Sequence, residues 1–190
     1  MKTLYMELNG VSEVLMHNPQ SMFQQAIADR GVSKKTIPTP EEEAKLGLYA
    51  MEDGRLYLPA VCVRNCMIKG AVGYRIGKRS AGSILAGAIM ITDDKFFFYR
   101  NGKNIKDYAI DVRRVVVGSG MRKAGIIRAR PMVKLPWQLR CVFAVNESLV
   151  SIEHIQPIME NAGQIIGIGD YRPSKTGWFG KFDVGVIQFR

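Results

Sequence analysis

The sequence predicts an α+β protein in which two helices cover one face of an antiparallel sheet, in the order βαββαβ. Two observations lead to this order. Segments of alternating or continuous apolar character occur at 2–8, 83–91, 137–145 and 182–189. Two segments with helical signals, 56–71 and 151–163, separate the first strand from the second and the third from the fourth.

The N-terminal part consists of one strand followed by a long excursion. KTLYMEL (2–8) alternates as a strand, and residues 11–55 then form an insertion with turn formers and mixed charge. Short helices are expected near 20–30 and 40–47. Thr39 is a suitable N-cap for the second helix, with Pro40 at the first helical position and acidic residues in the first turn.

The segment LYLPAVCVRNCMIKGA (56–71) is the strongest helix prediction. Pro59 is expected to open the helix and to hold Leu58 extended. One apolar face follows the helical period; it consists of Val63, Cys66, Met67 and Gly70. A glycine-rich basic loop (73–82) comes next, and SILAGAIMI (83–91) is then expected to be a strand.

The second half is predicted to hold a hairpin, a basic insertion and the last three core elements. Asn101-Gly102 indicates a hairpin turn within an insertion at 94–136. Strand 137–145 precedes a helix capped by Ser151, with Gly163 at its C′ position. Pro157 either kinks this helix or marks a later start. The order is ferredoxin-like, or RRM-like, and the 190 residues suit a single domain.

Composition indicates a polyanionic partner. The chain has 27 Lys and Arg against 17 Asp and Glu, a net charge of +10, which favours nucleic acid first and an anionic membrane surface second. No apolar run approaches the length of a membrane span, and the N-terminus lacks a signal-peptide pattern. Three cysteines without framework spacing fit a reducing cytoplasm.

Signals for catalysis are weak. Of the two histidines, His17 lies in LMHNP and could act as a general acid or base, although a surface role is the commoner one. Cys62 and Cys66 are one helical turn apart, but no second Cys or His pair accompanies them. Phosphate-binding loops, nucleophile elbows and zinc-protease motifs are missing from the sequence. We therefore expect no catalytic residue, no metal and no cofactor.

The basic loops carry the clearest functional signal. Glycines allow close approach to phosphates, cations attract them without sequence preference, and aromatic rings can stack on unpaired bases. The predicted nucleic-acid-binding residues are Arg64, Lys69, Arg75, Lys78, Arg79, Arg122, Lys123, Arg128, Arg130, Tyr171, Arg172, Lys175, Trp178 and Lys181. Because no recognition helix is evident, such loops suit a single strand better than a duplex. Each loop alone could equally be a solvated turn.

Two segments resemble a known family. LYLPAVCVRNCMIKGA resembles the helix segment, and GIGDYRPSKTGWFGKFDV (167–184) the glycine-rich loop, of the RAMP superfamily, the RNA-binding subunits of CRISPR effector complexes. The ordered set LMHNP, EEE, LP-helix, RARP and GIGDYRP…GKF is similar to phage and prophage relatives of the effector backbone subunit.

The resemblance implies a subunit that polymerises along a single strand and kinks it with an inserted thumb hairpin. By matching position, Arg64 and Lys69 would approach phosphates, residues 167–181 would line the same groove, and residues 113–136 would form the thumb. The chain is short for a backbone subunit. An aspartate matching that of target-cleaving relatives is not identifiable, and His17 lies outside the position of the repeat-processing histidine, which favours binding over cleavage.

The sequence therefore predicts a cytoplasmic, non-catalytic protein that binds single-stranded nucleic acid, with RNA slightly favoured over DNA, and self-associates as a ring or filament. A metal-independent endoribonuclease that uses His17 is one alternative. An interaction protein that mimics or inhibits a CRISPR effector subunit is another.

Overall fold

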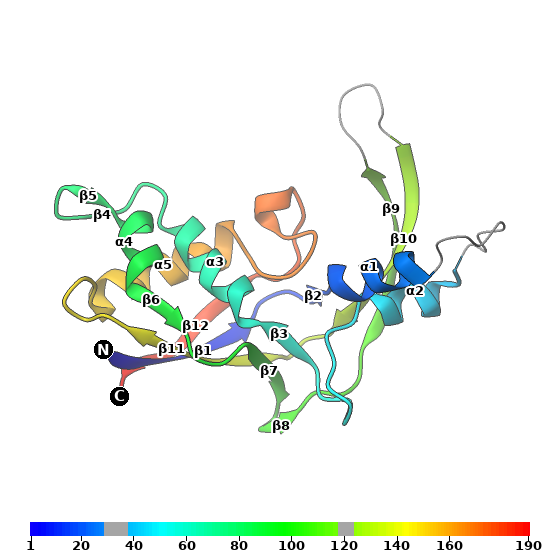
Figure 1. The fold of residues 1–190 in the computed structure, drawn as a ribbon, viewed down its shortest axis with the longest axis horizontal. Coiled ribbons are helices and arrows are strands. Elements are labelled where there is room, and N and C mark those ends of the chain that lie inside the picture. Colours follow the sequence, from blue (N-terminus) through cyan, green and yellow to red (C-terminus); the bar gives the residue numbers. More distant parts are fainter. Residues whose placement is uncertain (29–37, 118–123) are drawn as a thin grey trace.

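The computed structural model describes residues 1–28, 38–117 and 124–190, and their core is an antiparallel sheet with helices on one face (Figure 1). The strand order is β12-β1-β11-β7-β3, with β6 pairing to β11 and β8 to β7. The strands are β1 (Lys2–Gly10), β3 (Tyr57–Pro59), β6 (Ile89–Ile91), β7 (Lys95–Arg100), β8 (Lys103–Asn104), β11 (Gln138–Val145) and β12 (Phe182–Phe189). With β6 and β7 together as the second core strand, this is the ferredoxin-like arrangement that the sequence predicts.

Alternation along β1 and β11 produces the buried face of the sheet. Leu4, Met6 and Leu8 are fully buried, and each is opposite a buried residue of β11. The intervening side chains point to the other face, because successive strand residues alternate between faces. The sequence thus fixes which side of the sheet the helices can cover.

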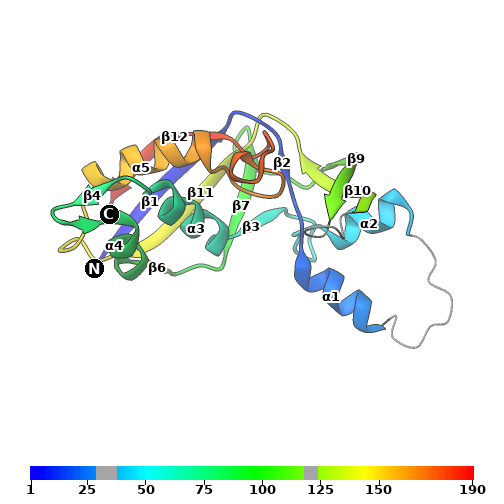
Figure 2. The ribbon, with the colours of Figure 1, turned by 90° about the horizontal axis from the view of Figure 1, so that it is seen from above.

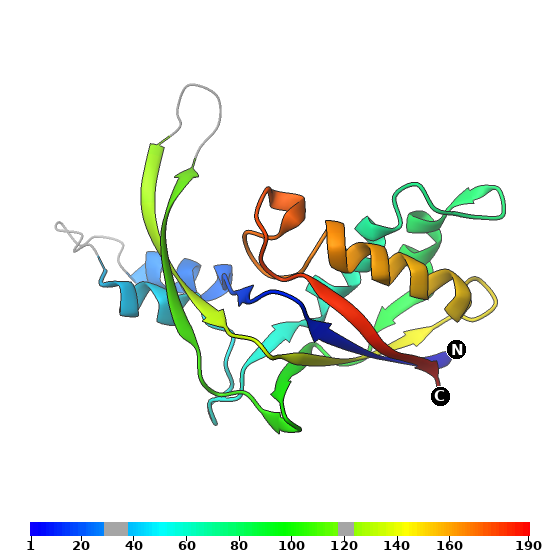
Figure 3. The same cartoon turned by 180° about the vertical axis from the view of Figure 1, so that it is seen from behind.

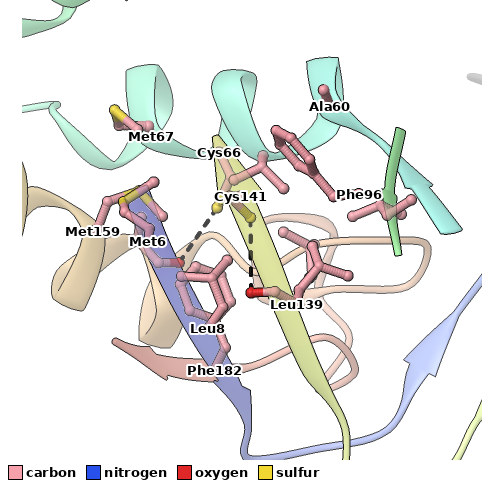
Figure 4. Packing of buried hydrophobic residues seen from close by; sticks show 14 of the residues in the cluster. Met6, Leu8, Ala60, Cys66, Met67, Phe96, Leu139, Cys141, Met159 and Phe182 are labelled. Carbon is pink, nitrogen blue, oxygen red and sulfur yellow. Dashed lines mark hydrogen bonds between the residues drawn. The ribbon is translucent and has the colours of Figure 1, made fainter. Parts of the chain in front are cut away.

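Helices α3 (Ala60–Gly70) and α5 (Ile152–Ile165) cover that buried face (Figure 2). Gly70 allows them to approach closely, since a Cβ at this position would lie 2.4 Å from the Cβ of Ala162. Figure 4 shows Met67 and Cys66 of α3 over the buried side chains of β1 and β11. The Sγ atoms of Cys66 and Cys141 donate to backbone carbonyls at 3.8 and 3.9 Å, and burial raises the pKa of both thiols.

The prediction of a strand over 83–91 is wrong for most of that segment. Helix α4 (Ala81–Ala88) occupies it, and only Ile89–Ile91 is extended. Ala81, Leu85 and Ala88 are buried at helical spacing, so the apolar run packs as a helix face beside α3. A short apolar run of small residues carries no alternation that would have excluded a helix.

Both core helices have boundaries that differ from the predicted ones. Helix α3 begins at Ala60, because Pro59 ends β3 with extended backbone, and Leu58 is extended as predicted. Helix α5 follows Ser151, contains Pro157 and continues past Gly163 to Ile165. Gly163 is not a C-terminal cap. It lies inside the helix, where a Cβ would be 2.1 Å from the carbonyl oxygen of Phe182.

The turn at Asn101-Gly102 is confirmed. Both residues have positive φ, 50° and 76°, and β7 pairs with β8 across them. Beyond this turn, β9 (Ala109–Val117) and β10 (Ala124–Val133) form a long antiparallel pair, here called the thumb hairpin, which stands away from the sheet (Figure 3). It lies within the insertion expected at 94–136, whereas β7, in the same range, belongs to the core sheet.

The N-terminal insertion lies at the base of the thumb hairpin. It contains β2 (Val14–Leu15), α1 (Pro19–Ala28) and α2 (Pro40–Leu46). Strand β2 pairs with β10, and α2 packs against β10. Thr39 caps α2 as predicted, in a reciprocal arrangement with Glu42. The predicted helix near 20–30 is confirmed to Ala28, and the rest of its range lies outside the described residues.

A small hairpin occupies the end of the molecule opposite the thumb hairpin (Figures 1 and 2). It consists of β4 (Arg75–Ile76) and β5 (Arg79–Ser80) and connects α3 to α4. In the described part of the chain, no helix combines the length and the apolar character needed to cross a membrane.

Candidate nucleic-acid interface

The glycine-rich loop, residues 167–181, is built on backbone conformations that favour glycine. Gly167, Gly169 and Gly180 have φ values of 70°, 75° and 69°. At Gly180 a Cβ would lie only 1.8 Å from the carbonyl oxygen of Ile168, because the two backbones are joined by a hydrogen bond of 2.9 Å from Ile168 N to Gly180 O. The loop is therefore closed on itself at its two ends.

Backbone hydrogen bonds attach the glycine-rich loop to the base of the thumb hairpin. Asp170 N donates to Leu15 O at 2.8 Å, and Gly180 N donates to Glu13 O at 2.7 Å. Because β2 also pairs with β10 of the thumb hairpin, the loop, β2 and the thumb base form one continuous layer.

On its other side the loop borders helix α3. A hollow of about 120 Å³ lies between them, lined on the helix by Cys62, Asn65, Cys66 and Lys69 and on the loop by Ile166, Gly167, Ile168, Gly169 and Arg172. We call this hollow the α3 groove. Lys69 and Asn65 are exposed at its rim, one helical turn apart. The structure thus brings together Lys69 and Arg172, which lie about a hundred residues apart in sequence.

Arg172 has a second role within the loop. Its guanidinium donates to Gly169 O at 2.6 Å and to Ser174 Oγ at 3.1 Å. These bonds hold the side chain at the mouth of the α3 groove while its charge remains available there.

Arg64 lies elsewhere. Its guanidinium donates to Ile89 O at 3.0 Å and to Ala86 O, and so satisfies carbonyls at the end of α4. The structure therefore gives Arg64 a part in joining α3 to α4 and does not bring it to the α3 groove.

The thumb hairpin contacts the loop through a cation and three rings. The Arg113 guanidinium carbon lies 5.4, 5.0 and 4.7 Å from the ring centres of Tyr171, Trp178 and Phe179. Its Nε donates to Asp111 at 2.6 Å, and this hydrogen bond raises the pKa of Arg113. Phe179 is buried, whereas Trp178 is 56% exposed and presents ring surface to solvent.

Two further thumb cations form ion pairs. Arg128 Nη1 lies 2.9 Å from Glu43 Oε1, and Arg130 Nε lies 2.8 Å from Asp170 Oδ2. The second contact has the distance of an ion pair without hydrogen-bond geometry, since Nε and Nη1 of Arg130 make no hydrogen bond within the described part of the chain. These pairs reduce the free positive charge at the thumb base.

His17 lies beside this charged cluster. Its side chain is exposed at the surface, yet partial burial lowers its pKa, with Arg128 and Arg130 acting in the same direction and Asp170 and Glu43 opposing. Its own carbonyl accepts a hydrogen bond from the Tyr49 hydroxyl at 3.0 Å.

The remaining predicted residues are dispersed. Arg75, Lys78 and Arg79 belong to the β4–β5 hairpin at the end opposite the thumb. Lys175 is exposed in a short 3-10 turn (Pro173–Lys175), and Lys181 follows Gly180, with its backbone bonded to Ser12. Arg122 and Lys123 lie outside the described residues. The structure therefore brings together only some of the predicted residues: α3, the loop and the thumb base meet, and the β4–β5 hairpin does not join them.

Sequence reasoning missed one residue that lines the α3 groove and the two acidic residues that neutralise thumb cations. Asn65 lines the α3 groove, and Asp170 and Glu43 pair with thumb cations. Asn65 lies four residues before Lys69, so helical spacing could have indicated their common face. The two acidic partners come from distant segments, and no local pattern marks them.

Together, the sheet order, the glycine-rich loop before the last strand and the inserted hairpin define a ferredoxin-like fold with an inserted hairpin. A comparison with solved structures supports this class. The chain is similar to a chain in the cryo-EM structure of the Type III-B Cmr-beta bound to cognate target RNA, with a TM-score of 0.58 and 14% identity. The match covers 99% of this chain and 60% of that one, so this chain spans about three fifths of its length. Neither a family profile nor a curated protein matches the sequence.

Proposed function

We propose that this protein binds single-stranded RNA along the α3 groove and the thumb base, as a non-catalytic subunit that associates with copies of itself along the strand. The observation that carries the proposal is the placement of Lys69 and Arg172 on opposite walls of one hollow, with the exposed ring of Trp178 on the same glycine-rich loop as Arg172. Cations that track phosphates and a ring that stacks on bases are the two elements of single-strand binding.

RNA is favoured over DNA because the similar solved structure is that of a complex bound to target RNA. The ordered motifs of the sequence favour a phage or prophage source, and the cysteine usage favours the cytoplasm. Three thumb cations, Arg113, Arg128 and Arg130, are already paired with acids. We therefore expect contacts with few phosphates and an affinity that depends moderately on salt.

The direct test is a fluorescence-anisotropy titration of the full chain with a labelled oligouridine of about 20 nucleotides and a matched oligothymidine, at several salt concentrations. Lys69→Gln removes one groove cation. It should weaken RNA binding about fourfold at 0.15 M salt and lower the salt slope by about 0.7, the value for one phosphate contact with a single strand. Lys78→Gln, on the β4–β5 hairpin, removes the same charge and should leave both quantities unchanged.

Equal losses in the two variants would show a general effect of net charge and would overturn the groove. Absence of any binding at low salt would overturn the whole proposal. The mass of the protein in solution, measured with and without RNA, tests self-association: a mass that stays at one chain in both conditions contradicts it.

A nuclease that uses His17 has one observation in its favour, the position of this exposed side chain beside Arg128 and Arg130. Incubation of labelled RNA with wild type and His17→Gln distinguishes the two functions. If the RNA is degraded by the wild type but not by His17→Gln, the protein is a nuclease and the non-catalytic proposal is wrong. If the function is instead interaction with another protein, a protein partner and not nucleic acid should co-purify with this chain from cells.

A further inference from the structure

The face of the sheet opposite the helices remains uncovered by secondary structure in the described part of the chain (Figures 1 and 3). We call it the open sheet face. The side chains on it come from the strand positions that alternate with the buried ones, among them Tyr5, Asn9, Tyr99, Gln138 and Arg140. It lies on the side of the sheet away from the α3 groove.

Aromatic rings on this face are stacked with cations. Four such stacks occur at 4.6 to 5.3 Å: Arg190 on Tyr5, Arg140 on Tyr99, Arg55 on Phe97 and Lys95 on Tyr57. The rings are half-buried, while Arg140, Arg190 and Lys95 are exposed. A guanidinium lying on a ring has a second planar face, and unpaired bases stack on guanidinium planes as well as on rings.

A hollow of about 260 Å³ lies at one end of this face. It is lined by Asn9 and Gly10 of β1, by Tyr99, Arg100 and Asn101 at the β7–β8 turn, and by Pro136, Trp137 and Gln138 before and within β11. It therefore combines a stacking ring with three side-chain amides.

The amides at the hollow are held in a defined orientation. Gln138 Nε2 donates to Asn9 Oδ1 at 3.0 Å and to Glu7 Oε1 at 3.3 Å. Both hydrogens of this amide nitrogen are then used. Among the described residues, Gln138 Oε1 has no hydrogen-bond partner, so one acceptor remains available at the hollow, whereas Asn9 Nδ2 lies against Gly185 of β12. An amide oxygen held in this way can accept a hydrogen bond from the edge of a nucleobase.

We infer that the open sheet face is a second site for single-stranded nucleic acid, with one base in the hollow beside Tyr99 and Arg140 and its edge on the amide oxygen of Gln138. The charge of the face favours this occupant. Besides Arg100 at the hollow, which pairs with Asp107, the face carries the four cations that lie on rings, and the opposing carboxylates are those of Glu7 and Asp53. The inference goes beyond the proposed groove and does not depend on it.

The experiment is photocrosslinking of the full chain to an oligonucleotide that contains 5-iodouridine, followed by identification of the crosslinked peptides. Wild type is expected to crosslink within residues 95–100, at Tyr99, in addition to the groove. The double variant Arg140→Gln/Arg190→Gln removes two exposed cations from the face and should reduce the crosslink at 95–100 about tenfold. The charge-matched control Lys78→Gln/Arg79→Gln should leave it at the wild-type level.

The groove variant Lys69→Gln separates the two sites, because it should lower crosslinking within 167–181 and leave that at 95–100 unchanged. Crosslinks confined to α3 and the loop would overturn the inference and leave the proposed function standing. Crosslinks confined to 95–100 would support the inference and overturn the groove. If Arg140→Gln/Arg190→Gln instead lowers the mass of the protein without oligonucleotide and no crosslink forms at 95–100, the face is an interface between copies and the inference is wrong.

Discussion

Gly180→Ala perturbs the point at which the glycine-rich loop closes. Gly180 has a φ of 69°, and a Cβ there would meet the carbonyl oxygen of Ile168 at 1.8 Å and its nitrogen at 3.0 Å. These atoms are backbone and cannot rotate away. The loop must therefore separate from residue 180 by more than 1 Å, roughly the difference from an ordinary carbon–oxygen contact.

The cost can be worked out from the contacts that this movement breaks. An alanine in the left-handed region costs about 1–2 kcal/mol. Ile168 N to Gly180 O and Gly180 N to Glu13 O are the hydrogen bonds at risk, each worth about 1 kcal/mol. The sum is about 3–4 kcal/mol, and for a chain of this size each kcal/mol lowers Tm by about 2–4 °C. We expect Tm to fall by about 10 °C.

Gly77→Ala is the matched control. Gly77 also has a positive φ, 59°, but a Cβ there meets nothing within 4 Å. This variant should carry only the conformational cost, about 1–2 kcal/mol and a fall of about 4 °C. Calorimetry gives Tm, and anisotropy with oligouridine gives the affinity, which only Gly180→Ala should lower. If the two variants have the same Tm and the same affinity, the close approach at Gly180 does not position the loop and the reasoning is refuted.

Three further outcomes are expected. Asp170→Asn leaves the Arg130 guanidinium, whose side chain is only 12% exposed, without its anion and should cost about 2 kcal/mol in urea unfolding. Arg130→Met leaves Asp170, which is 30% exposed, and should cost less; a larger cost for Arg130→Met would contradict this reasoning. Because the pKa of His17 is lowered in the folded state, the unfolded chain binds the proton more readily. The wild type should therefore lose more stability than His17→Gln as the pH falls through about 6.5 toward 5. Parallel pH profiles of the two proteins would show that His17 is not desolvated. Trp178→Ala should weaken oligouridine binding about tenfold with a small change in Tm, since the ring is largely exposed, and unchanged affinity would remove it from the interface.

Much of the core could be predicted from local patterns. Alternation marked β1 and β11, Thr39 marked the start of α2, and Asn101-Gly102 marked the β7–β8 turn, because each depends on residues that are adjacent in sequence. The segment 83–91 could not be assigned in this way, since its buried helix face is set by packing against α3.

The candidate site was predictable only in part. The composition of residues 167–181 predicts the glycine-rich loop, and in the structure this loop lies beside Lys69. The destinations of the cations did not follow from their positions in sequence. The Arg64 guanidinium donates to carbonyls at the end of α4, the Arg113 guanidinium lies over three aromatic rings, and Arg130 pairs with Asp170.

The sequence by itself determined the order of the core elements, the buried face of the sheet and the excess of positive charge. Hydrophobic periodicity and net charge depend only on the residue types and their spacing along the chain. Only the tertiary structure decided which cations are free to meet a ligand. Whether a cation is free depends on an acidic or carbonyl partner from a distant segment, and only the folded backbone brings that partner within contact distance. The same dependence formed the hollow on the open sheet face, where β1, β7 and β11 bring an aromatic ring and two amides together.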